Sequence, residues 1–332
     1  MTSGSLLQVK RLRVVFRMRG GDVTVLDDLD LEVRAGETLC LVGESGSGKT
    51  MTALALLGLV PQPNGAVAGG SIRFMGEEMV GASEARLREL RGKEIAMIFQ
   101  EPMTALNPVF TVGDQIAEAL RYHDGLGRRA ALARAGEMLR AVGIPSPERR
   151  LRDYPHQLSG GMRQRAMIAM ALACRPKLLI ADEPTTALDV TVQAQILDLL
   201  RDLQRDLGTA ILLITHDMGV VAEMADRVAV LYAGRKVEQG RADAVLSRPA
   251  HPYTQALISC LPALAPDADG APRPLAEIPG IVPSLAELPP GCAFAPRCRF
   301  AMARCAAEVP PCIAVEHGHE SACWLNAREV AA

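Results

Sequence analysis

The stretch Gly43-Glu44-Ser45-Gly46-Ser47-Gly48-Lys49-Thr50 decides the fold, because it matches the pattern G-x-x-x-x-G-K-[ST] of a phosphate-binding loop. Residues 37–60 as a whole have the pattern of a strand, a glycine-rich turn and a helix. Glycines let the backbone curve so that its N–H groups surround phosphate oxygens. The Lys49 ammonium can reach the β- and γ-phosphates, and the Thr50 hydroxyl can bind Mg²⁺. All eight residues are therefore predicted to bind a nucleotide.

A second motif lies at the end of the apolar run LLIADE, residues 178–183. Asp182 and Glu183 close a predicted buried strand, which is where open α/β sheets bind ligands. One carboxylate can hold Mg²⁺ through water, and the next can polarise an attacking water. Together with the phosphate loop, this pair predicts an α/β fold of the P-loop NTPase (RecA-like) class.

The apolar runs IAMIFQ (95–100) and AILLITH (210–216) predict two further buried strands. Residues 190–207, which lie between the predicted strands at 178–183 and 210–216, have apolar side chains at helical spacing. Gly208 is a suitable residue to end this helix. A strand, a helix and a strand of these lengths predict a parallel sheet.

Composition places the chain among globular proteins. It has 332 residues, 49% of them hydrophobic and 22% charged, so about two domains are expected. A net charge of −2 and only 3% aromatic residues argue against a nucleic-acid partner. Apolar runs are too short to span a bilayer, and the N-terminus lacks the features of a signal peptide, so a cytosolic chain is expected.

Two segments interrupt this pattern. Residues 101–175 are Arg-rich and lack buried strand runs, which predicts a helical insertion. Residues 262–290 contain eight of the 22 prolines, as linkers do, and a cysteine cluster follows them. We therefore predict a nucleotide-binding domain at 6–260 and a small Cys-rich C-terminal module at 261–332.

The segment LSGGMRQR, residues 158–165, resembles the signature motif of ATP-binding cassette (ABC) ATPases. The resemblance covers about residues 6–250 and implies an ABC nucleotide-binding domain with a β subdomain. Other family motifs fall in order: Gln100 resembles the Q-loop glutamine, Ala187-Leu188-Asp189 the D-loop, and His216 the switch histidine. Phe16 resembles the aromatic that stacks on adenine, although a core strand position explains it nearly as well.

The resemblance also implies a mechanism. In this family two ATPase domains enclose two ATP molecules, each between one phosphate loop and the opposite signature motif. Ser159, Gly160 and Gly161 are then expected to act on the partner's ATP, with Asp189 nearby. Glu183 would be the general base and His216 would steady the γ-phosphate. The Mg²⁺ ligands would be Thr50, Gln100 and Asp182.

Four further segments resemble the ATPases of dipeptide, oligopeptide and nickel importers: QEPMTALNP (100–108), HPYTQAL (251–257), IPGIVPSL (278–285) and GCAFAPRCRFAMARC (291–305). This resemblance implies a related sister ATPase, two transmembrane permease subunits and an external solute-binding protein as partners. It implies a place at the cytoplasmic face of the cell membrane. The alternative is a non-transport ABC ATPase with a regulatory or nucleic-acid-linked role.

Cys292, Cys298, Cys305 and Cys323 are separated by five, six and 17 residues, unlike zinc ribbons or bacterial ferredoxins. The spacing alone leaves a metal site and reduced structural thiols both open. The resemblance implies a [4Fe-4S] cluster on these four cysteines; Zn²⁺, with His317 and His319 nearby, is the alternative. Cys312 departs from the family pattern. Because the cluster would lie outside the P-loop core, ATP binding is expected to survive loss of the cluster.

Overall fold

The computed structural model describes residues 5–101, 105–185, 189–260 and 277–328, in two compact units. The first unit comprises residues up to 6, 33–38 and 74–214. The second comprises residues 7–32, 39–73 and 215–332. The predicted domain boundary near residue 260 does not coincide with this division, and it stays a prediction.

Three parallel strands form the sheet of the first unit: β6 (Ile95–Ile98), β7 (Leu178–Asp182) and β8 (Ala210–Thr215). Leu178 of β7 lies opposite Ile95 on one side and Ala210 on the other. Every residue of β7 and β8 is buried, as the continuous apolar runs predict for strands covered on both faces. The parallel arrangement is confirmed.

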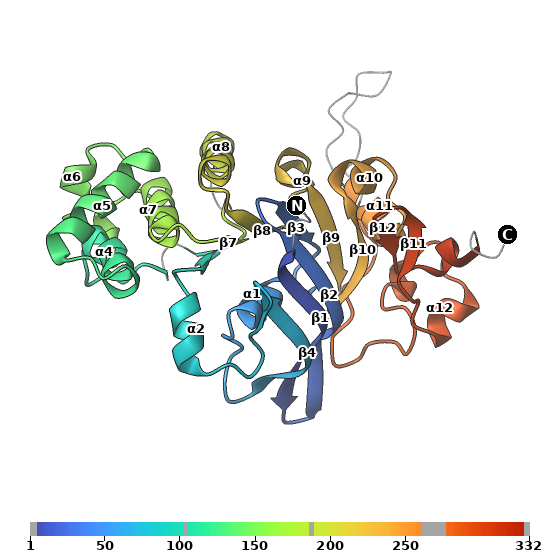
Figure 1. Ribbon diagram of the computed structural model, residues 1–332. Helices are drawn as coiled ribbons and strands as arrows, with labels where there is room; N and C mark the ends of the chain where they lie inside the picture. Colours follow the sequence, from blue (N-terminus) through green and yellow to red (C-terminus); the bar gives the residue numbers. More distant parts are fainter. Residues whose placement is uncertain (1–4, 102–104, 186–188, 261–276, 329–332) are drawn as a thin grey trace, which may run out of the picture. The chain divides into compact units, whose positions relative to one another are not determined.

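Helices make up much of the rest of the first unit, and most of them fall in the predicted insertion (Figure 1). The helices of the first unit are α2 (Glu84–Leu90), α4 (Val112–His123), α5 (Arg128–Ala141), α6 (Pro147–Arg150), η1 (Pro155–Gln157), α7 (Gly160–Leu172) and α8 (Val190–Leu207). Gly208 ends α8 with a positive φ of 67°, as expected for a helix stop. Among the described parts of 101–175 no strand occurs, so the helical character is confirmed.

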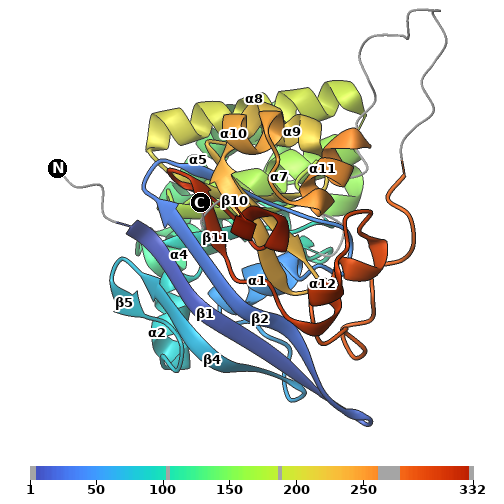
Figure 2. The same cartoon turned by 90° about the vertical axis from the view of Figure 1, so that its right-hand side faces the viewer.

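A sheet of long strands occupies the N-terminal part of the second unit (Figure 2). The strands β1 (Ser5–Met18), β2 (Gly21–Arg34) and β4 (Gly65–Phe74) lie in the order β2-β1-β4. The short strand β5 (Glu77–Glu78) belongs to the first unit. This sheet is the β subdomain that the family resemblance implies.

The second sheet of this unit has the order β3-β9-β10-β12-β11. Here β3 (Thr38–Val42) runs parallel to β9 (Arg227–Tyr232), and β10 (Arg235–Arg241) is antiparallel to β9. The C-terminal strands β11 (Ile313–Glu316) and β12 (His319–Ser321) continue it through β10. The cysteine-rich segment is therefore joined to the second unit by the pairing of β12 with β10. The proline-rich composition of residues 262–290 gave no indication of this pairing.

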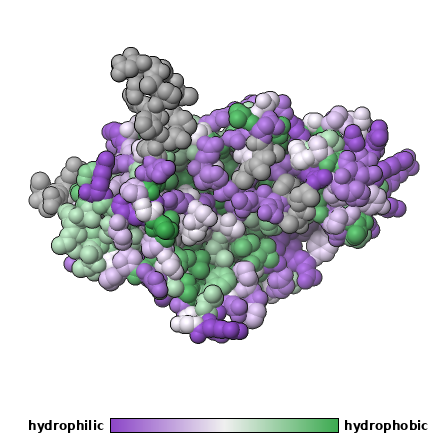
Figure 3. Space-filling view, turned by 180° about the vertical axis from the view of Figure 1, so that it is seen from behind, coloured by the Kyte–Doolittle hydropathy of each residue, from purple (hydrophilic) through white to green (hydrophobic). Residues whose placement is uncertain are grey.

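The helices of the second unit are short: α1 (Lys49–Leu56), α9 (Met218–Met224), α10 (Ala242–Ser247), α11 (Pro252–Ser259), η2 (Ala295–Arg297), α12 (Ala303–Ala307) and η3 (Trp324–Arg328). In the described parts of the chain, no helix combines the length and apolarity that crossing a membrane requires. On the face shown in Figure 3, hydrophobic residues lie in groups broken up by hydrophilic ones.

A buried polar cluster fixes the start of α11. The His251 ring accepts a hydrogen bond from the Tyr253 N–H at 3.0 Å and so caps the helix. The backbone N–H of His251 donates to Glu238, whose carboxylate also contacts His319 Nε2 at 2.7 Å. Burial lowers the pKa of His251 to about 4, although a hydrogen bond with the Ala322 backbone opposes this. His251 is therefore neutral in the folded protein at physiological pH.

This shift predicts a loss of stability in acid. Below pH 6.5 the unfolded chain protonates His251 while the folded protein, with its lowered pKa, does not, so stability falls as the pH drops from about 6.5 toward 4. We expect the free energy of unfolding to be about 2 kcal/mol lower at pH 5 than at pH 7.5 through this group. Denaturant titrations of wild type and His251→Asn, which keeps the cap, test this. Equal pH dependence in the two proteins would contradict it.

Candidate nucleotide site

The phosphate loop follows β3. Two of its glycines, Gly43 and Gly48, have conformations and positions that other residues cannot easily adopt. A Cβ on Gly43 would lie 2.3 Å from the Leu231 carbonyl oxygen and 2.7 Å from Ser47 Oγ. Gly48 has a φ of 102°, and a Cβ there would lie 2.7 Å from Leu26. The glycine requirement predicted from the motif is therefore set by close backbone packing inside the second unit.

Lys49 lies over this loop. Its ammonium donates to the carbonyl of Gly43 at 2.7 Å and to that of Glu44 at 3.0 Å, and the residue is 7% exposed. Thr50 and Ser45 are exposed, so the rim of the loop faces solvent. An ammonium and a hydroxyl at the N-terminus of α1 can together receive an anionic, metal-chelating group.

Glu44 has partners that sequence reasoning missed. Its N–H donates to the Tyr253 hydroxyl at 2.8 Å, and its carboxylate accepts two bonds from Arg297, at 2.7 and 3.0 Å. Burial raises the pKa of Tyr253 above its ordinary value, so this phenol stays neutral. The carboxylate raises the pKa of Arg297 further above its usual range. Both partners lie in segments quoted above for their family resemblance, but nothing in the sequence pairs them with Glu44.

Two other predicted residues belong to the second unit. His216 is exposed directly after β8, immediately before Asp217, which caps α9. Phe16 is half-buried on β1, and its ring comes within 2.8 Å of where a Cβ on Gly65 of β4 would lie. The ring thus packs on the neighbouring strand, and its role toward adenine stays a prediction.

The first unit brings the predicted carboxylates and Gln100 together. Asp182 ends β7 and is 2% exposed. Glu183 follows with a φ of 47°, and its N–H donates to the Ile214 carbonyl at 2.9 Å. The Gln100 amide donates to Glu183 Oε2 at 3.0 Å. An amide that donates to one oxygen of a carboxylate restricts the orientation of that carboxylate.

The signature segment forms the start of α7. Ser159 caps this helix by accepting from the Met162 N–H at 3.4 Å, and both Ser159 and Gly160 are exposed. A Cβ on Gly161 would touch Val192 at 3.4 Å, so the motif lies beside the start of α8. Asp189 caps α8 through the Val192 N–H. Ala187 and Leu188 of the predicted D-loop lie outside the described residues.

The four predicted cluster cysteines line one small cavity together with aromatic residues that include Phe294, Phe300 and Trp324. Burial is the main cause of the raised pKa values of the Cys292, Cys298 and Cys323 thiols, to about 11 for Cys323. All eight cysteines are free. In the described ranges, no three His, Cys, Asp or Glu side chains are arranged to hold a metal ion. The structure thus gathers the thiols without forming the expected metal centre.

The remaining cysteine and histidines lie elsewhere. Cys312 lines a different cavity, where partial burial of its sulfur and the nearby Glu320 carboxylate raise the pKa of the thiol to about 11. His319 is held by Glu238, and neither His317 nor His319 is among the described residues that line the four-cysteine cavity.

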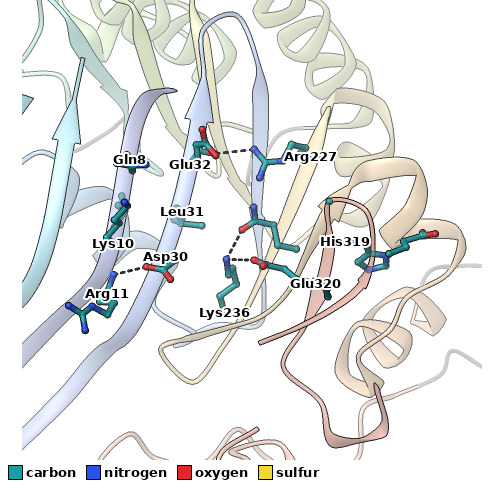
Figure 4. A pocket seen from close by; sticks show the side chains of 15 residues that line it. Gln8, Lys10, Arg11, Asp30, Leu31, Glu32, Arg227, Lys236, His319 and Glu320 are labelled. Atoms are coloured by element: carbon teal, nitrogen blue, oxygen red, sulfur yellow. Dashed lines mark hydrogen bonds and ion pairs between the residues drawn. The ribbon is translucent and has the colours of Figure 1, made fainter. Parts of the chain in front are cut away.

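A separate cavity of about 630 Å³ lies between β1, β2 and the edge strands of the second sheet (Figure 4). Its lining includes four basic and four acidic residues. Lys236 bridges Gln239 and Glu320, at 2.8 and 2.6 Å, and Asp30 accepts from the Arg11 N–H. No predicted nucleotide-site residue lines it, and its equal numbers of basic and acidic residues give no net attraction for a nucleotide.

Models of known families match three ranges of this chain. A family model described as "ABC transporter" matches residues 26–186, and one described as "Oligopeptide/dipeptide transporter, C-terminal region" matches residues 237–305. A model for an AAA domain (putative AbiEii toxin, Type IV TA system) matches residues 152–222.

Full-length relatives are also similar. The chain is 52% identical over 339 aligned residues to a putative peptide import ATP-binding protein of Brucella melitensis, with 100% of both chains covered. It is 51% identical to the oligopeptide transport ATP-binding protein OppD of Haemophilus influenzae, with 98% of both chains covered.

Solved cassettes share the fold. The dimeric post-hydrolysis state of the ATP-binding cassette MJ0796 bound to ADP and Pi matches with a TM-score of 0.63 and 27% identity, over 71% of this chain and 98% of that one. The cbiO1 structure from Clostridium perfringens, described as part of the ABC transporter complex cbiONQ, matches with a TM-score of 0.61 and 28% identity, over 74% and 91%.

The phosphate loop, the carboxylate pair and the signature helix define an ABC-type ATPase, and the predicted P-loop fold class is confirmed. Within that class, the chain belongs to the family of ABC transporter ATP-binding proteins that carry the oligopeptide/dipeptide transporter C-terminal region.

The close approach at Gly43 generates a prediction. Gly43→Ala places a methyl group against the Leu231 carbonyl, a backbone atom that cannot move without shifting β9. We expect a loss of about 2 kcal/mol in the free energy of unfolding. Gly20→Ala is the control, since nothing lies within 4 Å of its Cβ position. Equal denaturant midpoints for the two variants would contradict the packing argument.

Proposed function

We propose that this chain is the ATP-hydrolysing subunit that energises peptide import through a separate membrane permease. The supporting observation is that one chain joins an intact phosphate loop to a peptide-transporter C-terminal region, with full-length similarity to proteins named for peptide import. A non-transport ABC ATPase is less consistent with these names and with the near-neutral charge.

Each group of predicted site residues would have its own role in binding and hydrolysing ATP. Amides of the loop and the Lys49 ammonium would bind the phosphates, which a helix N-terminus favours. Thr50, Asp182 and Gln100 would supply the oxygen ligands that Mg²⁺ prefers, and the ion would neutralise phosphate charge. Glu183, oriented by Gln100, would accept the proton of the attacking water. His216 would stabilise the γ-phosphate.

Ser159, Gly160 and Gly161 would act on ATP held by a second ABC ATPase, because exposed N–H groups at a helix start suit an anion presented from outside. This makes a dimer, with a related sister subunit or with itself, part of the proposal. Two transmembrane permease subunits and an external solute-binding protein would complete the importer. The chain would then lie at the cytoplasmic face of the membrane.

The chemical roles predict distinct defects. Glu183→Gln keeps the size and polarity of the side chain but removes the base, so ATP binding should persist while kcat falls at least about a hundredfold. Lys49→Ala removes a phosphate ligand, so the Kd for ATP should rise. Fluorescent-nucleotide titration and phosphate release measure the two effects. Turnover near wild type in Glu183→Gln would refute the assigned base.

The four cysteines that line one cavity are proposed to hold a [4Fe-4S] cluster, with Zn²⁺ as the alternative. Four thiolates are a suitable donor set for either, and the apolar cavity excludes water. The cavity is only about 10 Å³, so loading would have to move the cysteine-bearing turns apart. A bound cluster would act as a covalent staple for a segment with little apolar core.

This proposal predicts a metal content. Anaerobically purified protein should contain iron and sulfide, and replacement of any one of Cys292, Cys298, Cys305 or Cys323 by Ser should lower the iron content. Cys312→Ser is the matched control, because Cys312 lines another cavity. Elemental analysis and a sulfide assay measure the metal content. Zinc without iron would refute the [4Fe-4S] cluster and support the Zn²⁺ site, and the absence of any metal would refute both proposals.

A further inference from the structure

The phosphate loop is held from outside by the C-terminal region. Glu44, the first variable residue of the loop, is fixed by its N–H on Tyr253 and by its carboxylate on Arg297. Tyr253 belongs to α11 and Arg297 to η2, one residue before Cys298. Together these two side chains make three hydrogen bonds with one residue of the loop.

The partners of Glu44 are themselves rigidly placed. The Arg297 side chain is 4% exposed, and it also donates to the carbonyls of Pro279 and Ile278, at 2.9 and 3.3 Å. The guanidinium thus bridges the carboxylate and a third chain segment. A two-bond fork between a guanidinium and a carboxylate fixes orientation as well as distance.

An aromatic cluster supports the same contact. Tyr253 lies edge to face against Tyr232 of β9 with ring centroids 4.6 Å apart, and Phe294 lies 5.3 Å from both rings. All three residues are at most 3% exposed, and Tyr232 also accepts a bond from Arg297 at 3.3 Å. Moving Arg297 or Tyr253 would therefore disturb a packed core.

Two hydrogen bonds connect Glu44 with the atoms that are predicted to bind phosphate. Lys49 donates to the Glu44 carbonyl, and the Ser47 N–H donates to the same oxygen at 3.2 Å. The position of the Glu44 carbonyl therefore helps to fix the Lys49 ammonium and the backbone of Ser47 in the middle of the loop. A loop that is already ordered loses less entropy when it binds its ligand.

We propose that Tyr253 and Arg297 form a clamp on Glu44 that preorganises the phosphate loop, so that nucleotide affinity depends on the C-terminal region. This inference rests on the proposed ATPase function and adds positioning residues to its site.

Three conservative variants of the full-length protein test the clamp. Glu44→Gln removes the charge, Arg297→Lys removes the fork, and Tyr253→Phe removes the hydroxyl but keeps the ring. We expect each to raise the Kd for a fluorescent ATP analogue about three- to tenfold. Arg241→Lys is the matched control, because Arg241 forms a similar but exposed fork with Asp243 in the same unit.

Two readouts separate positioning from a general loss of structure. Hydrogen exchange should accelerate in residues 43–50 while the Tm falls by no more than a few degrees. The double variant Glu44→Gln, Arg297→Lys should bind ATP no worse than its weaker-binding single variant, since both remove one contact. Unchanged Kd values in Glu44→Gln and Arg297→Lys, or fully additive losses in the double variant, would overturn the clamp. Absence of ATP binding by wild type would instead refute the proposed function, and the clamp with it.

Discussion

The second unit depends on how tightly the phosphate loop is enclosed by its own backbone neighbours. The Leu231 carbonyl occupies the space beside Gly43, and the Gly234 N–H donates to the Ser47 carbonyl at 3.0 Å. Leu26 closes the side next to Gly48. Because strands β2 and β9 and the turn after β9 meet at this loop, its shape is a property of the whole unit. A phosphate group would therefore meet a loop whose geometry already exists before binding.

The C-terminal region contributes to that enclosure from several elements. It extends the second sheet through β12 and β10, and it contributes Phe294 to the aromatic cluster around Tyr253. His251 starts α11 by capping it and so sets the direction of the Tyr253 side chain. Segments that sequence comparison recognises as typical of peptide transporters thus have a local physical role, because they contact the predicted phosphate loop.

The first unit presents chemistry of a different kind. Gln100 and Glu183, far apart in the sequence, meet at a single hydrogen bond beside the buried Asp182. Asp182 ends a fully buried strand, whereas Glu183 is only half-buried and Gln100 follows β6 in an exposed position. A rigid carboxylate therefore lies next in sequence to a more accessible hydrogen-bonded pair, as a site that responds to its ligand requires.

The sequence by itself determined the phosphate loop, the buried parallel strands and the helix over residues 190–207, because motif spacing and apolar periodicity act over a few residues. It also named Asp182, Glu183 and Ser159 as candidates. Only the tertiary structure placed Tyr253 and Arg297 on Glu44, from 209 and 253 residues away. It alone joined β12 to β10 and separated Cys312 from the four-cysteine cavity. These contacts arise from packing between distant segments, and no local pattern encodes which side chains will meet there.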